Sequence, residues 1–138
     1  MIWLLDANLI LDVLLNRTPF FEASSAVWKA VDEGRVKGVV AGHAITTIYY
    51  LLRKSLDYLS AQREISVLVG LFKVATVNAD VIKTALSLAW TDFEDAVSAV
   101  AAERAGCDLI VIRNPKHFRN SVLPVYTPES SMLLLSKI

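Results

Sequence analysis

The sequence predicts an α/β fold of three layers, α/β/α, around a central parallel sheet of about five strands. Short apolar runs alternate along the chain with segments of helical periodicity, which is typical of crossover connections between parallel strands. The composition, 54% hydrophobic and 20% charged, suits strands buried on both faces. The length of 138 residues, with no linker or repeat, indicates a single domain over residues 1–138.

The first third of the chain predicts two strands and two helices. Residues 1–5 are an apolar run too short for an ordinary helix and fit a buried strand. A short helix over residues 9–15 follows, with Asn8 as its N-cap. Thr18 and Pro19 indicate the start of a second helix, which Gly34 ends. The β-branched residues 38–41 form the second predicted strand.

The middle of the chain predicts two helices, a strand and the start of a third helix. Residues 44–58 carry apolar side chains at helical spacing, namely Ile45, Ile48, Tyr49 and Leu52. Ser60 can cap the next helix, whose apolar stripe is Ile65, Leu68, Val69 and Phe72. Residues 73–77 form a strand, and Asn78 caps the helix after it.

The last third predicts a helix of small residues, two strands and a terminal helix. Thr91 and Glu94 have the spacing of a capping box, and Gly106 ends the alanine-rich helix that follows. Residues 109–112 and 122–126 are the fourth and fifth predicted strands. Thr127 and Pro128 then start a terminal helix by cap and proline.

Charge and cysteine content limit the possible functions. The formal net charge is zero, so a nucleic-acid partner would need basic residues gathered locally. Cys107 is the single cysteine, which excludes an internal disulfide or a thiolate metal site. No signal peptide and no membrane-spanning run is evident, so we expect a cytoplasmic protein.

Acidic side chains are predicted at two places where strands and helices meet. Asp6 follows the first strand, at the carboxyl edge where open α/β sheets bind ligands. Asp92, Glu94 and Asp95 crowd one helix start, and Asp95 shares a helix face with Ala99 and Ala102, so it should point toward the sheet.

Structural roles compete with functional ones at each of these positions. Asp6 can cap the helix after it, and Glu94 can close the capping box on Thr91. An inward Asp95 needs either a cation such as Arg113 or Lys116, or a bound metal. Asn114, after the fourth strand, can be a turn residue. Carboxylate and amide oxygens without clustered Cys or His are the ligands of Mg²⁺ or Mn²⁺.

Three motifs in order resemble the PIN domain family, and most closely its bacterial subgroup of VapC-type toxin ribonucleases. They are residues 5–8 (LDAN), residues 92–97 (DFEDAV) with Ala99 and Ala102, and residues 110–118 (IVIRNPKHF). The resemblance implies a compact α/β/α domain whose acidic residues hold Mg²⁺ or Mn²⁺ for RNA hydrolysis. It also implies frequent homodimerisation and a small antitoxin as protein partner.

The resemblance assigns expected roles to individual residues. Asp6 and Asp95 match two acidic positions of the family and are expected to bind the metal, with Asp92 as an additional ligand and catalytic residue. Asn8, Arg113, Asn114 and His117 are expected to bind or orient substrate. The chain departs from the family at Ile48 and Tyr49, where Glu is frequent, and at Ile112, Asn114 and His117.

The sequence therefore predicts a metal-dependent endoribonuclease with RNA as its substrate. The resemblance adds the expectation that this ribonuclease is the toxin of a toxin–antitoxin pair. Because the acidic set is thin, the alternative is a weak or inactive PIN-like module that binds RNA or a protein. Basic residues that could contact phosphates are Arg17, Arg53, Lys54, Arg113, Lys116 and Arg119.

Overall fold

The computed structural model describes residues 1–118 and 120–138, so Arg119 lies outside the described residues. In this part of the chain, five strands form one parallel sheet in the order β3-β2-β1-β4-β5. The strands are β1 (Ile2–Leu5), β2 (Lys37–Ala41), β3 (Lys73–Ala75), β4 (Leu109–Val111) and β5 (Val125–Tyr126). The predicted parallel sheet of about five strands is confirmed.

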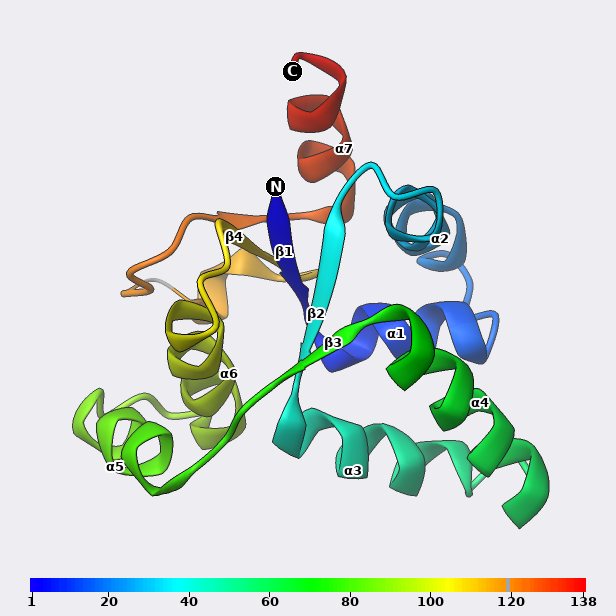
Figure 1. Ribbon diagram of the computed structural model, residues 1–138, viewed down its shortest axis with the longest axis horizontal. Coiled ribbons are helices and arrows are strands. Elements are labelled where there is room, and N and C mark those ends of the chain that lie inside the picture. The colour runs from blue at the N-terminus through cyan, green and yellow to red at the C-terminus, as the bar shows by residue number, and fades with distance from the viewer. Residues whose placement is uncertain (119) are drawn as a thin grey trace.

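Helices cover both faces of this sheet, as the predicted three layers require. They are α1 (Ala7–Leu14), α2 (Phe21–Asp32), α3 (Gly42–Leu52), α4 (Tyr58–Leu71), α5 (Ala79–Ser87), α6 (Phe93–Arg104) and α7 (Pro128–Ser136). A 3₁₀ turn spans Pro115–Phe118. Figure 1 shows α5 and α6 on one side of the sheet and α1 and α2 on the other. Among the described helices, none is both long and apolar enough to cross a membrane.

Several strand and helix ends differ from the prediction. The strands are shorter because a strand extends only as far as the neighbour with which it pairs. Strand β3 is an edge strand that pairs with β2, and β2 ends at Ala41, so residues 76–77 have no partner. Strand β5 is reduced to Val125–Tyr126 because β4 is only three residues long. The predicted helix over residues 44–58 ends at Leu52, and Val69 on α4 is exposed rather than part of an apolar stripe.

Four predicted caps are wrong, and in each case a neighbouring residue starts the helix. Asp6 caps α1 instead of Asn8, which confirms the capping role also considered for Asp6. Asp57 caps α4 instead of Ser60, and Asp92 caps α6 instead of Thr91. Helix α2 begins at Phe21 without a side-chain cap, since residues 18–20 form a turn. In each of the first three, an Asp carboxylate accepts a backbone N–H of the first helical turn.

Two other predicted caps are confirmed. The Asn78 side chain accepts a hydrogen bond from the Val81 amide at the start of α5. Thr127 caps α7 and forms a capping box with Ser130, with Pro128 in the first turn. Gly34 and Gly106 follow α2 and α6 with positive φ angles of 75° and 76°, which glycine adopts without strain.

The centre of the sheet is packed so closely that one strand position requires glycine. A Cβ on Gly38 in β2 would lie 2.5 Å from a ring carbon of Phe72 and 2.8 Å from Cγ1 of Val31. Both neighbours are buried, so neither can move into solvent. This position therefore couples β2 to α2 and to the end of α4.

We expect Gly38→Ala to lower the free energy of unfolding by about 1–3 kcal/mol, because the added methyl overpacks this contact. Gly70→Ala is the matched control: a Cβ on Gly70 in α4 meets nothing within 4 Å. That change should raise stability by about 0.5 kcal/mol through helix propensity. Urea unfolding of both variants checks the pair, and equal effects would contradict the packing explanation.

Candidate functional site

The site lies at the carboxyl ends of β1 and β4, where the order of strand addition reverses: β2 and β3 lie on one side of β1, and β4 and β5 lie on the other. Strand β1 is central, with β2 on one side and β4 on the other, so the carboxyl ends of β1 and β4 border a topological switch point. Asp6 follows β1 directly, and its backbone N–H donates to the carbonyl oxygen of Val111 at 3.0 Å. Ile112, Arg113 and Asn114 follow β4 at the same edge.

Helix α6 brings the second group of acidic residues to this edge. The Asp92 carboxylate accepts a hydrogen bond from the Asp95 backbone N–H at 3.0 Å, which fixes the first turn of the helix. Asp95 lies on the same face as the buried Ala99 and Ala102, and its side chain is 15% exposed. Because small residues let α6 approach the sheet closely, Asp95 points inward, as predicted.

The seven predicted site residues line one pocket of about 530 Å³. They come from the end of β1, the start of α6 and the segment after β4, which are far apart in sequence. Phe20 and Ile112 complete its described lining, and the seven are Asp6, Asn8, Asp92, Asp95, Arg113, Asn114 and His117. We refer to this cavity as the carboxylate pocket.

The carboxylates in this pocket disfavour each other's ionised forms. Burial and the neighbouring Asp92 and Asp6 carboxylates raise the pKa of Asp95 to about 7. Burial likewise raises the pKa of Asp6, although the hydrogen bond from the Asn8 amide partly opposes this. Two acidic groups held in proximity at such a cost are a common feature of functional sites.

Neither of the two cations that the sequence suggested for Asp95 pairs with it, which leaves the alternative of a bound metal open. In residues 1–118 and 120–138, neither Arg113 nor Lys116 forms an ion pair with Asp95. The nearest basic atom is Nδ1 of His117, 4.0 Å from Oδ2 of Asp95, on a side chain that is 59% exposed. At this distance and exposure the contact adds little, even with a protonated imidazole.

Arg113 is held by a residue that the sequence did not identify as part of the site. Nε of Arg113 lies 3.6 Å from Oδ2 of Asp12, and its guanidinium lies 4.1 Å from the centre of the Phe20 ring. Asp12 is fully buried on α1 and also accepts a hydrogen bond from the Ser24 hydroxyl. A lone acid inside the apolar helix of residues 9–15 was the available signal for it.

The segment after β4 is ordered by its own polar side chains. The side-chain Oδ1 of Asn114 accepts a hydrogen bond from the backbone N–H of Lys116, which is the turn role considered for it. The side-chain Nδ2 of Asn114 lies 3.4 Å from Nε2 of His117. Asn114 therefore supports the loop and also lines the carboxylate pocket.

The residues that replace the family's frequent glutamate do not contribute acid here. Ile48 on α3 is fully buried in the core. His43, at the start of α3, instead contacts α6, with Nε2 3.1 Å from the Glu94 carbonyl oxygen and 3.3 Å from the Ser98 hydroxyl. Arg53 and Lys54 lie beyond the end of α3, beside Tyr58 and Tyr50 rather than in the pocket lining.

The donor set suits a cation that keeps much of its water. Among the described residues, no three His, Cys, Asp or Glu side chains form a group that could hold a metal ion. Mg²⁺ is often bound through only one or two carboxylates together with waters and substrate phosphate oxygens. Asp6 and Asp95, mutually repelling and without an Arg or Lys partner among the described ion pairs, fit that mode of binding.

Comparisons with known proteins agree with this architecture. The family model described as PIN domain matches residues 3–116. Ribonuclease VapC1 of Aquifex aeolicus (strain VF5) is 26% identical over 129 residues, covering 90% of this chain and 88% of that protein. The structure of VapBC-1 from nontypeable Haemophilus influenzae has a TM-score of 0.69 at 19% identity, covering 94% of this chain and 99% of that one. A toxin-antitoxin complex from Klebsiella pneumoniae has a TM-score of 0.68 at 18% identity, with coverages of 91% and 96%.

Proposed function

Because this chain belongs to the PIN domain family, we propose that it is an endoribonuclease that uses Mg²⁺ or Mn²⁺ to hydrolyse RNA phosphodiester bonds. The observation that carries the proposal is the meeting of Asp6 and Asp95 in one pocket at the switch point of the sheet. The relative named Ribonuclease VapC1 supports the choice of RNA as substrate.

The chain's own side chains have distinct roles in this proposal. Asp6 and Asp95 hold the cation, whereas Asp92, expected from the sequence as an additional ligand, lines the pocket and fixes the first turn of α6. The bound cation would lower the pKa of the attacking water and neutralise charge on the phosphate. Asn8 and Asn114 offer amide groups to the substrate, and His117 lines the same pocket. Arg113 presents its guanidinium at the wall, held in place by Asp12 and Phe20.

We further propose an antitoxin protein as a partner, since one structural neighbour is a toxin-antitoxin complex. Helix α4 and the last turn of α3 expose large apolar side chains that a partner could cover. They are Tyr50 on α3 and Tyr58, Leu59, Val67 and Val69 on α4. A homodimer and a cytoplasmic location stay predictions from the sequence.

A second candidate function is a PIN-like module that binds RNA or a protein without cleaving RNA. It is favoured by the buried Ile48 and by the lack, among the described residues, of a three-residue ligand group. Isothermal titration with Mn²⁺ separates the two candidates. Saturable binding at millimolar metal supports the nuclease, and its absence supports the binding module.

The direct test is cleavage of single-stranded RNA by the purified protein. We expect cleavage with Mn²⁺ or Mg²⁺, loss of cleavage on addition of EDTA, and recovery when excess metal is restored. The reason is that a phosphate can approach two mutually repelling carboxylates only when a cation lies between them. Cleavage that persists in EDTA would contradict metal dependence, and no cleavage with any divalent metal would leave the second candidate.

A further inference from the structure

A second cavity, of about 720 Å³, lies beside the carboxylate pocket and shares two residues with it. It is formed by the turn of residues 88–93 before α6 and by described residues of the segment after β4. Asp92 and His117 line both cavities, so a ligand that occupies one can continue into the other. An RNA strand with one phosphate near Asp6 and Asp95 would therefore place a neighbouring nucleotide at this second cavity.

The wall of the second cavity includes a tryptophan held in place from behind. The rings of Trp90 and Phe118 pack edge to face, with their centres 5.2 Å apart and an angle of 74° between them. Phe118 is buried in the core, whereas Trp90 is half-buried and lines the cavity. A rigid, partly open indole is a stacking surface for a nucleobase, because every base has a π face.

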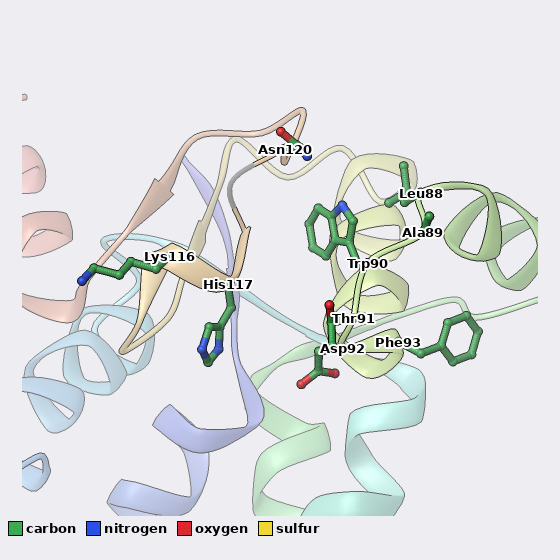
Figure 2. A pocket seen from close by; sticks show the side chains of 9 residues that line it. All are labelled: Leu88, Ala89, Trp90, Thr91, Asp92, Phe93, Lys116, His117 and Asn120. Atoms are coloured by element: carbon green, nitrogen blue, oxygen red, sulfur yellow. The ribbon is translucent and has the colours of Figure 1, made fainter.

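The polar groups around the indole suit an uncharged ring better than a phosphate. Figure 2 shows Trp90 between Asn120 and Asp92, while the side chain of Lys116 points away from the indole. The Asp92 carboxylate would repel a phosphate but can accept a hydrogen bond from a base amino group. The Asn120 amide can both donate to and accept from a base edge.

We infer that this cavity binds one unpaired nucleobase of the RNA strand whose phosphate lies at the carboxylate pocket. The inference rests on the proposed ribonuclease function and names its substrate as single-stranded RNA with one base turned toward Trp90. A base within a duplex would first have to unstack and unpair, which costs free energy. Selectivity for a single-stranded segment follows from that cost.

The test measures RNA binding with Ca²⁺ in place of Mg²⁺ or Mn²⁺, so that the carboxylates still have a cation, and gel analysis of the recovered RNA checks that cleavage plays no part. A labelled eight-nucleotide RNA is compared, by fluorescence anisotropy, with copies in which one nucleotide at a time lacks its base. We expect one abasic position to weaken binding about 10-fold, since loss of one base–aromatic stack has about that effect. Trp90→Ala should weaken binding of the intact RNA to a similar extent and remove the sensitivity to that position.

Further variants keep the test decisive. Trp90→Phe preserves an aromatic face and should retain most of the affinity. Trp90→Leu keeps an apolar side chain against Phe118 without a π face, and it replaces Trp90→Ala as the test if Trp90→Ala does not fold. Trp28→Phe is the matched control, because Trp28 packs against Phe72 away from this cavity. Asn120→Ala removes only an exposed side chain and should change which base is preferred.

The outcomes separate this inference from the proposed function. RNA cleavage in Mn²⁺, together with an abasic profile that removal of the Trp90 ring leaves unchanged, would reject the base site and keep the nuclease. Binding that depends on one base and on Trp90, without cleavage under any metal, would keep the base site and reject the nuclease. Equal binding of all abasic copies by the native protein would overturn the inference.

Discussion

Asp95→Asn is expected to lower the rate of RNA cleavage in Mn²⁺ by about 100-fold or more, and Asp6→Asn by a similar factor. Both side chains line the carboxylate pocket, and each change removes an anionic oxygen without altering side-chain size. Because the pocket offers a cation few protein ligands, no nearby acid replaces the one that is lost. Initial rates on a fluorescent single-stranded RNA measure the effect.

Asp32→Asn is the matched control for this experiment. Asp32 is an exposed carboxylate at the end of α2, just before β2 begins and so at the opposite edge of the sheet. Its replacement should leave the rate unchanged. A second measurement, the rise in thermal midpoint on adding Mn²⁺, should be present in the native protein and lost in Asp6→Asn and Asp95→Asn, because only the native site binds metal. Equal rates in all four proteins would show that the activity is a contaminant.

The architecture was predictable because its signals are local and mutually consistent. Buried runs such as residues 109–112 and capping signals such as Thr127 with Pro128 identify elements without knowledge of their neighbours. Element ends were less accurate, since pairing decides them. Residues 76–77 have strand composition, yet β2 ends at Ala41 and leaves them nothing to pair with.

The site was predictable where backbone position alone determines it. Asp6 follows a strand and Asp95 faces inward on a helix of small residues, so the parallel sheet brings them to one edge. The ion pair between Arg113 and Asp12 could not be predicted, because the two residues lie on different elements and meet only in the folded chain. The shift of two caps to Asp57 and Asp92 has a related cause, since local spacing does not show which oxygen reaches the first free N–H groups.

Asp6 has both the structural role and the position that the functional role requires: it caps α1 and it also lines the carboxylate pocket. Its Oδ2 accepts the Asn8 amide at 3.1 Å, which is the capping role, while the side chain also lines the carboxylate pocket. A capping hydrogen bond orients the carboxylate and leaves lone pairs free for a cation. Asp92 combines the two roles in the same way at the start of α6.

Asp95→Asn is also expected to stabilise the metal-free protein, by on the order of 3 kcal/mol at pH 8 and by much less at pH 4. Burial and the Asp92 and Asp6 carboxylates raise the pKa of Asp95 to about 7, above the ordinary value of 3.8 for an unperturbed Asp. Because the pKa of Asp95 is raised in the folded state, the native protein has its full free energy of unfolding below the unfolded-state pKa of 3.8. That free energy falls as pH rises from there through about 7. Asn resembles the protonated acid and avoids this loss, although it gives up a helix-dipole interaction of about 0.3–1 kcal/mol.

Urea unfolding in EDTA at several pH values between 4 and 8 measures this difference directly. The gain in unfolding free energy of Asp95→Asn over the native protein should grow as pH rises and level off above about 7. Asp32→Asn, at the opposite edge of the sheet, should give no comparable gain at any pH. A variant that gains stability at pH 8 while losing cleavage and Mn²⁺ binding would identify Asp95 as a residue kept for function at a cost in stability. A destabilised Asp95→Asn at pH 8 would mean instead that the carboxylate serves the fold, and the proposed metal site would lose its main electrostatic support.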